Sequence, residues 1–147
     1  MNIAINPKAP VVECQSIIIQ TPASRVWEVL TSIDNWAQWQ TSVTESQLHG
    51  PVQQGTSFSW TAAGIRFESS IHTSIENSAF GWTGKTTGVR AIHNWSFEEK
   101  EGTSTVRVEE SLQGFLPRLL RGSFRKSLRR GMEIQLHELK KACESET

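Results

Sequence analysis

The feature that most constrains this chain is a strict two-residue alternation in its middle. Between residues 65 and 76 every odd position carries an apolar or small side chain, and every even position a polar one, from Arg66 to Glu76. Successive side chains of a β-strand point to opposite faces, so the segment predicts a strand with one face buried and the other in water. Such half-buried strands are typical of an antiparallel sheet with its core on one side.

Other stretches rich in β-branched or aromatic residues extend this sheet to about seven strands. Turn residues separate them, notably Gly50-Pro51, Gln54-Gly55 and Gly88. The additional strands are expected at residues 11–20, 43–49, around 58–60, 78–85, 89–98 and 103–112.

Two short helices are expected after the first strand. In the first, residues 22–32, Thr21 is the predicted N-cap and Pro22 the first helical residue. Its apolar residues recur at steps of three and four; they are Val26, Trp27, Leu30 and Ile33. In the second, Asp34 is the predicted N-cap, and Trp36 and Trp39 lie on one side.

The C-terminal segment, residues 116–145, predicts one long helix. Its apolar stripe consists of Leu116, Leu120, Phe124, Leu128, Met132, Leu136 and Leu139. Steps of four advance about 40° around a helical wheel, so the stripe winds around the helix. A helix gripped by a curved sheet needs such a stripe, and Gly122 and Gly131 mark expected bends. The predicted fold class is therefore α+β, a curved antiparallel sheet wrapped around a long C-terminal helix.

The register of the last two strands brings two polar residues together. A loop of two or four residues centred on Glu101-Gly102 pairs Trp95 with Val108 and His93 with Glu110, whereas a three-residue loop would turn polar side chains toward the aromatic residues. His93 and Glu110 both lie on otherwise apolar strand faces. We expect them to be neighbours inside the sheet's concave side.

Length, charge and cysteine content limit the possible function classes. The 147 residues fit one domain, with residues 1–9 as a flexible N-terminal segment. Fifteen basic and fifteen acidic residues create no overall field that attracts nucleic acid. The chain shows neither a leader peptide nor a membrane-spanning stretch, which predicts a cytoplasmic protein without stable membrane insertion. Cys14 and Cys143 are expected as free thiols, and no metal or cofactor is predicted.

The order of elements and several sequence motifs together resemble the START/polyketide cyclase-dehydrase (SRPBCC) superfamily, which has the helix-grip fold, over nearly the whole chain. The motifs are residues 22–27 with Asp34, Trp36 and Trp39; Gly55 before Phe58 and Trp60; residues 80–95; residues 102–114; and the closing Leu139 to Ala142. The resemblance implies a cavity between sheet and helix that holds an apolar molecule. It supplies no catalytic signature, because this superfamily includes carriers, receptors and enzymes.

We therefore expect this protein to bind a small, largely apolar, lipid- or polyketide-like ligand. The candidate ligand-binding residues are Trp60, Phe67, Trp82, His93, Trp95 and Glu110. The alternative is a polyketide cyclase/dehydratase-type enzyme that uses His93 and Glu110 for acid–base steps. A dimeric regulator with a vestigial pocket is a third possibility, and the oligomeric state stays open.

The remaining charged and aromatic residues have ordinary structural interpretations. Core packing is the more common role for any single tryptophan on an inward face. His49, His72 and His137 are expected at the surface. A basic stretch in the first half of the last helix is interpreted as a solvated face, since one basic stretch in a neutral chain is weak support for a phosphate-binding patch; it contains Arg118, Arg121, Arg125, Lys126, Arg129 and Arg130.

Overall fold

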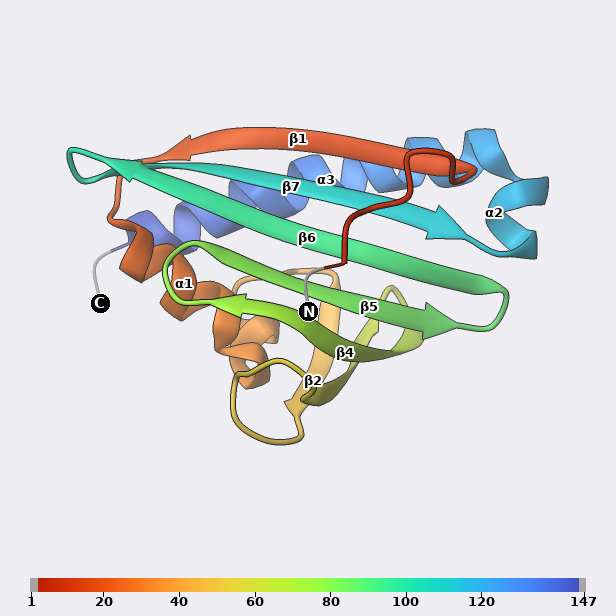
Figure 1. The fold of residues 1–147 in the computed structure, drawn as a ribbon, viewed down its shortest axis with the longest axis horizontal. Coiled ribbons are helices and arrows are strands. Elements are labelled where there is room, and N and C mark those ends of the chain that lie inside the picture. The colour runs from red at the N-terminus through yellow and green to blue at the C-terminus, as the bar shows by residue number, and fades with distance from the viewer. Residues whose placement is uncertain (1–2, 146–147) are drawn as a thin grey trace.

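A computed structural model of the chain describes residues 3–145. Within these residues seven strands form one antiparallel sheet, in the order β1-β7-β6-β5-β4-β3-β2 (Figure 1). The strands are β1 (Val11–Ile19), β2 (Val43–Leu48), β3 (Ser57–Ala62), β4 (Ile65–Ile75), β5 (Ala79–Thr86), β6 (Val89–Lys100) and β7 (Thr103–Gln113). Every neighbour except the β1–β7 pair is also consecutive in the chain, so short turns connect most of the sheet.

The helices cover one face of this sheet. Helix α1 (Ala23–Thr31) and the 3-10 helix η1 (Ile33–Gln38) follow β1, and α2 (Phe115–Leu119) and α3 (Arg121–Glu144) end the chain. Figure 1 shows α3 running behind the sheet along its long axis, with α1 near one end of the molecule and α2 at the other. The predicted α+β helix-grip architecture is confirmed.

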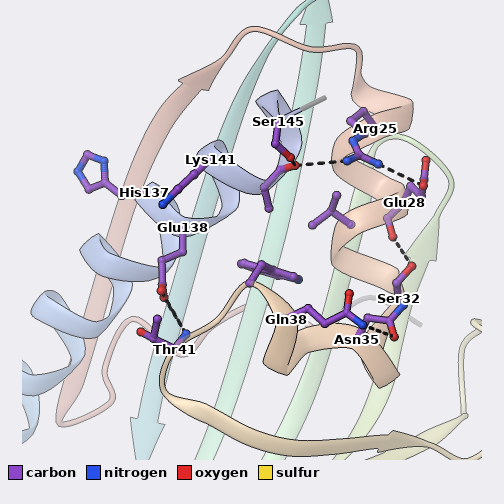
Figure 2. A pocket seen from close by; sticks show the side chains of 13 residues that line it. Arg25, Glu28, Ser32, Asn35, Gln38, Thr41, His137, Glu138, Lys141 and Ser145 are labelled. Carbon is purple, nitrogen blue, oxygen red and sulfur yellow. Dashed lines mark hydrogen bonds and ion pairs between the residues drawn. The ribbon is translucent and has the colours of Figure 1, made fainter. Parts of the chain in front are cut away.

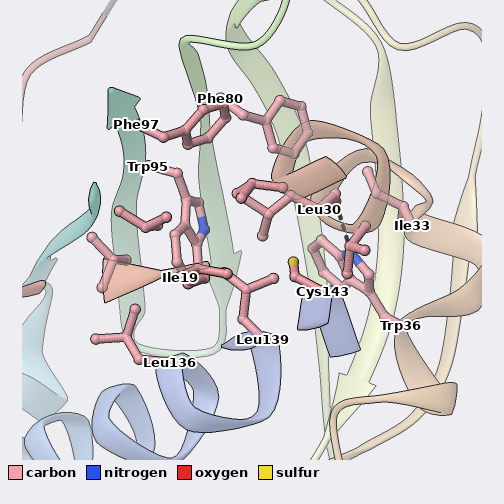
Figure 3. Packing of buried hydrophobic residues seen from close by; sticks show 14 of the residues in the cluster. Ile19, Leu30, Ile33, Trp36, Phe80, Trp95, Phe97, Leu136, Leu139 and Cys143 are labelled. Carbon is pink, nitrogen blue, oxygen red and sulfur yellow. Dashed lines mark hydrogen bonds between the residues drawn. The ribbon is translucent and has the colours of Figure 1, made fainter. Parts of the chain in front are cut away.

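The hydrophobic core lies beneath the C-terminal half of α3. Met132, Leu136, Leu139 and Cys143 are buried there against inward-facing residues of the sheet and α1 (Figure 3). Burial of each leucine side chain contributes about 1.5–3 kcal/mol. The indole of Trp36 adds a hydrogen bond, because its N–H donates to the Leu30 carbonyl at 3.0 Å. This end of the space between helix and sheet is thus filled by side chains.

The prediction of a single C-terminal helix was wrong, because the chain breaks at Leu120. Leu120 has φ −120° and ψ 44° and separates α2 from α3, and its side chain is 51% exposed. Two contacts fix α2 against the end of the sheet: the Leu116 N–H donates to the Gly88 carbonyl at 3.3 Å, and Pro117 is buried. Because α3 follows a different direction, the chain cannot remain helical between them.

Both predicted N-caps were also wrong. Pro22, not Thr21, occupies the N-cap of α1, and the Ala23 N–H donates instead to the Glu99 carboxylate at 2.8 Å. Asp34 lies inside η1, where its carboxylate accepts the Leu48 N–H at 2.7 Å. An acidic side chain therefore joins the start of each helix to a strand: Glu99 of β6 binds α1, and Asp34 of η1 itself binds β2.

His72 is not at the surface, contrary to the sequence-based prediction. It does lie on the outer side of the sheet, but only 7% of it is exposed, because residues 3–10 cross that side (Figure 1). The Ile3 N–H donates to His72 Nδ1 at 3.1 Å, and Asn94 donates to the Ile3 carbonyl at 2.8 Å. Further along, the Asn6 N–H donates to Ser111 Oγ at 3.2 Å. Flexibility of residues 1–9 stays a prediction, and residues 1 and 2 lie outside the described residues.

The alternation in β4 is interrupted at the same place. The register with β5 shifts between Ile71 and Thr73, as in a β-bulge. At the two strand ends, Ile65 and Ile75 are 47% and 48% exposed, so the inward face is buried only in its central part.

Candidate functional site

The predicted register of the last two strands is confirmed. His93 lies opposite Glu110, Trp95 opposite Val108, and Lys100 opposite Thr103 across a two-residue turn. Both turn residues have positive φ, 54° at Glu101 and 76° at Gly102, which is the geometry of a type I′ hairpin. The hairpin thus sets the position of His93 beside Glu110.

His93 and Glu110 form a hydrogen-bonded pair on the concave side of the sheet. His93 Nδ1 contacts a Glu110 carboxylate oxygen, and the two side chains are only 9% and 13% exposed. The His93 ring also stacks on Trp82, with centroids 4.4 Å apart and planes 6° from parallel. Both its position and its orientation are therefore held by neighbours.

This pairing determines what the imidazole can do chemically. When the neutral ring donates its Nδ1 proton to Glu110, Nε2 carries the lone pair and can accept a proton or a hydrogen bond. His93 Nε2 is buried and has no hydrogen-bond partner among the described residues. A buried polar atom without a partner costs free energy, which a ligand hydroxyl would recover by donating to it.

A second carboxylate lies next to Glu110 on the neighbouring strand. Glu13 of β1 is directly opposite Glu110 in the register, and its side chain is 11% exposed. Two like charges so close together repel each other, but Arg129 of α3 donates to Glu13 at 3.1 Å. Each carboxylate thus has its own partner, and the Glu13–Arg129 pair joins β1 to the first half of α3.

An apolar pocket of about 420 Å³ opens beside the pair, beneath α2 and the first turn of α3. Its lining is mainly aromatic and aliphatic, with His93, Glu110, Lys85 and a few hydroxyl groups as the polar components. The lining residues are Trp60, Ile65, Phe67, Ser69, Trp82, Gly84, Lys85, Thr86, Thr87, Val89, Ala91, His93, Glu110, Leu112, Leu116 and Phe124. It occupies the end of the helix–sheet space that the core leaves open.

Two small residues explain why the space stays open there. Along the inward face of β5 and β6, Phe80 lies opposite Trp95 and Trp82 opposite His93, but the next pair is Gly84 with Ala91. A side-chain carbon built at Gly84 would lie 2.9 Å from Ser69 Oγ, so even a methyl group would crowd this wall. Large inward side chains fill one half of the sheet, and small ones form the pocket in the other half.

Five of the six candidate ligand-binding residues line this pocket. Trp60 and Phe67 form one wall, stacked with centroids 4.8 Å apart, and the Trp60 indole N–H donates to Ser69 Oγ at 3.0 Å. Trp95 is not among the lining residues; it is 1% exposed and belongs to the core.

Several lining residues were not selected from the sequence. Gly84 and Ala91 shape the pocket, and Leu116 and Phe124 cover it from α2 and α3. The signal for the first two was present, because a glycine two positions after Trp82 leaves a gap in the aromatic face. Leu116 and Phe124 can cover the pocket only because the helix breaks at Leu120, and the hydrophobic periodicity of this segment did not indicate that break.

A larger, more open hollow of about 700 Å³ lies at the opposite end, between α1, η1 and the end of α3. Its charged rim is largely paired (Figure 2): Arg25 contacts Glu28 at 3.2 Å and the Ala142 carbonyl, and Glu138 accepts the Thr41 N–H at 3.1 Å. Because these groups bind one another and the backbone, the apolar pocket is the stronger candidate for a ligand site.

Several properties of the described residues complete the picture. No group of three His, Cys, Asp or Glu residues in 3–145 is arranged to hold a metal ion. Within the same range, no helix combines the length and apolar character needed to cross a bilayer. Cys14 and Cys143 are free thiols, as predicted.

Fold and site together define a helix-grip domain with a pocket between its sheet and its last helices. The chain belongs to the polyketide cyclase / dehydrase and lipid transport family, whose sequence profile matches residues 14–144. No curated protein sequence matches the chain significantly.

Solved structures share this fold at low sequence identity. A hypothetical protein from Helicobacter pylori, jhp0584, is 14% identical, with a TM-score of 0.84 and 98% coverage of both chains. A protein from Thermus thermophilus is 16% identical, with a TM-score of 0.77 over 90% of this chain and 96% of that one. The ZhuI aromatase/cyclase of a Streptomyces species is 13% identical, with a TM-score of 0.79 over 90% and 93% of the two chains. These similarities establish the fold.

Proposed function

We propose that this protein binds a small, largely apolar molecule in the pocket beneath α2 and α3. The observation that carries the proposal is the apolar pocket itself. It is open at one end, and the stacked rings of Trp82 and His93 form its inner wall. A concave apolar site with a few convergent polar groups is the usual form of a small-molecule site. The family's description, which includes lipid transport, agrees with it.

The geometry also indicates what kind of molecule fits. The Trp60–Phe67 wall favours a flat or extended apolar body, because aromatic faces stack on such surfaces. At the inner end, His93 Nε2 is an unpartnered acceptor in the neutral form described above. A ligand with an apolar body and one hydroxyl group therefore complements the pocket best.

A neutral fluorescent probe, N-phenyl-1-naphthylamine, tests this proposal. We expect saturable binding by the wild-type protein, with one probe per chain. Ala91→Phe places a ring in the pocket and should weaken binding at least about tenfold, because it removes the volume that the probe needs. Ile92→Phe is the matched control, since its side chain lies on the opposite side of the same strand. Equal binding by the wild type and Ala91→Phe would contradict the proposal.

A second candidate function, a polyketide cyclase or dehydratase, is favoured by the His93–Glu110 pair. In such a reaction His93 Nε2 would remove a proton from a carbon between two carbonyl groups. The resulting enolate carbon would bond to a distant carbonyl carbon and so close the ring, and the alkoxide oxygen formed there would take the proton back from the His93 imidazolium. Loss of that hydroxyl with a hydrogen from the adjacent carbon, as water, would then introduce a double bond into the ring. Glu110 would stabilise the imidazolium formed in the first step.

The two functions are separated by conservative variants of the pair. His93→Gln and Glu110→Gln should leave binding of the neutral probe within a few-fold of the wild type in either case. If the protein is a cyclase, the wild type should change the ring products formed from a synthetic poly-β-keto thioester, and both variants should return the product ratio to the uncatalysed one. An unchanged product ratio with the wild type would exclude this activity for that substrate class.

A further inference from the structure

The break between α2 and α3 exposes three large apolar side chains at one end of the molecule. Phe115 is 59% exposed, Leu119 75% and Leu120 51%. Figure 1 shows α2 at one extremity of the long axis, beyond the ends of the neighbouring strands. Together with the cations described next, these three residues are called the α2 tip. Single exposed leucines are common, but three on one short projecting segment are not explained by packing.

The same segment is strongly basic. Residues 111–132 contain six of the chain's fifteen cations and none of its fifteen acidic residues. Arg129 pairs with Glu13. Within residues 3–145 the other five form no ion pair; they are Arg118, Arg121, Arg125, Lys126 and Arg130. Although the net charge of the chain is zero, the charges are therefore distributed unevenly: this segment is basic and the rest of the chain is acidic.

The α2 tip also borders the pocket. Leu116 of α2 and Phe124 of α3 line the pocket. Leu119 and Leu120 lie between these two residues in the sequence and are exposed. Any movement of α2 would therefore change both the pocket opening and the exposed apolar surface.

We propose that the α2 tip docks on an anionic membrane surface, and that the apolar ligand enters and leaves the pocket there. The cations would contact lipid phosphate groups, and Phe115, Leu119 and Leu120 would lie among the acyl chains nearest the headgroups. The transfer of ligand rests on the function proposed above, whereas the docking does not.

The shape of the tip favours a membrane over an acidic protein or nucleic acid. Phe115, Leu119 and Leu120 are exposed within or beside α2, which lies at one end of the molecule, so a rigid partner would need a surface shaped to fit them, while a lipid surface deforms around them. Nucleic acid would use the cations but leave the leucines exposed to water. The basic residues alone indicated only a solvated helix face. Together with the exposed apolar side chains beside them, they indicate a membrane-docking surface.

Vesicle co-sedimentation tests the docking. The wild-type protein should sediment with vesicles in which about a third of the lipid is phosphatidylglycerol, and much less with pure phosphatidylcholine. Binding should weaken in about 0.5 M salt, which screens the charges. Arg121→Gln with Arg125→Gln should weaken binding roughly 30-fold, about fivefold for each charge lost near the surface. Lys100→Gln with Arg107→Gln removes two cations outside the tip and should leave binding unchanged.

The apolar contribution is tested separately. Leu119→Ser with Leu120→Ser should weaken vesicle binding by about tenfold or more, because less apolar area enters the membrane. Ile18→Ser with Ile75→Ser is the matched control, since these side chains are 59% and 48% exposed elsewhere on the sheet. All four residues are exposed, so both variants should fold.

The outcomes distinguish this inference from the function of the pocket. If the wild type binds the neutral probe but not anionic vesicles, or if the α2-tip variants bind vesicles as well as their controls do, the docking is wrong and the pocket function stands. If Ala91→Phe and the wild type bind vesicles equally while neither binds the probe, the docking stands and the ligand transfer fails. Tight binding to nucleic acid or an acidic protein, without vesicle binding, would also overturn it.

Discussion

Gly114 holds α2 in its position at the end of the sheet, and replacing it tests how α2 is placed. Gly114 is the N-cap of α2, with φ 118° and ψ 174°. This backbone region is almost restricted to glycine, since a side-chain carbon there costs about 1–3 kcal/mol. In Gly114→Ala the new carbon would also lie 2.3 Å from the Gly88 carbonyl oxygen, closer than any stable contact, and this oxygen is a backbone atom that cannot rotate away.

The expected cost of Gly114→Ala follows from these two effects. The backbone strain and the displacement of the turn at Gly88 together should lower the free energy of unfolding by about 3–4 kcal/mol. Gly102→Ala is the matched control, because Gly102 also has a positive φ, 76°, but has nothing within 4 Å of the added carbon. Its cost should be the strain alone, about 1 kcal/mol.

Urea unfolding monitored by tryptophan fluorescence measures both values. The midpoint should fall in the order wild type, Gly102→Ala, Gly114→Ala, with a common slope against urea concentration. Because Leu116 also contacts this region, Gly114→Ala should weaken probe binding, whereas Gly102→Ala should not. If the two variants lose the same stability, the close approach of Gly114 to Gly88 does not hold α2, and the reasoning about the pocket opening fails.

Two further predictions concern buried titratable groups. Burial lowers the pKa of His72 from 6.5, so the folded state resists protonation of this side chain. Neutral His72 therefore contributes free energy of unfolding that is fully present above pH 6.5 and is lost as the pH falls toward the lowered pKa. His72→Asn should make stability less dependent on pH in that range, and an unchanged dependence would show that the Ile3 contact does not require neutral His72. Burial raises the pKa of Cys143 to about 12, so this thiol stays protonated and unreactive at pH 8. A thiol reagent should therefore label Cys14 alone in the folded protein and both cysteines in urea. Rapid labelling of both cysteines without urea would contradict the burial of Cys143.

Much of the sheet could be predicted because its information is local. The alternation in β4 and the matching apolar faces of β6 and β7 each depend on a few neighbouring residues, and they indicate the strands and the register of the last two directly. The pairing of His93 with Glu110 followed from the same reasoning. A one-residue error would have turned polar side chains inward, so the apolar pattern left few alternatives.

The errors all involve segments that meet from distant parts of the chain. The side of His72 in its strand was predictable, but its burial was not, because Ile3 covers it from 69 positions away. The break at Leu120 arises where α2 meets Gly88, and the carboxylate that binds the first N–H of α1 comes from Glu99. Hydrophobic periodicity carries no information about such encounters.

The sequence alone therefore determined the strands, the register of the last two, the concave aromatic face and the His93–Glu110 pair, since side-chain alternation acts over short distances. Only the tertiary structure decided where the space beneath the last helices stays open. Trp95 fills one half of it against the core, whereas Gly84 and Ala91 leave the other half to the pocket. That outcome depends on the direction of α2, which contacts between distant residues determine.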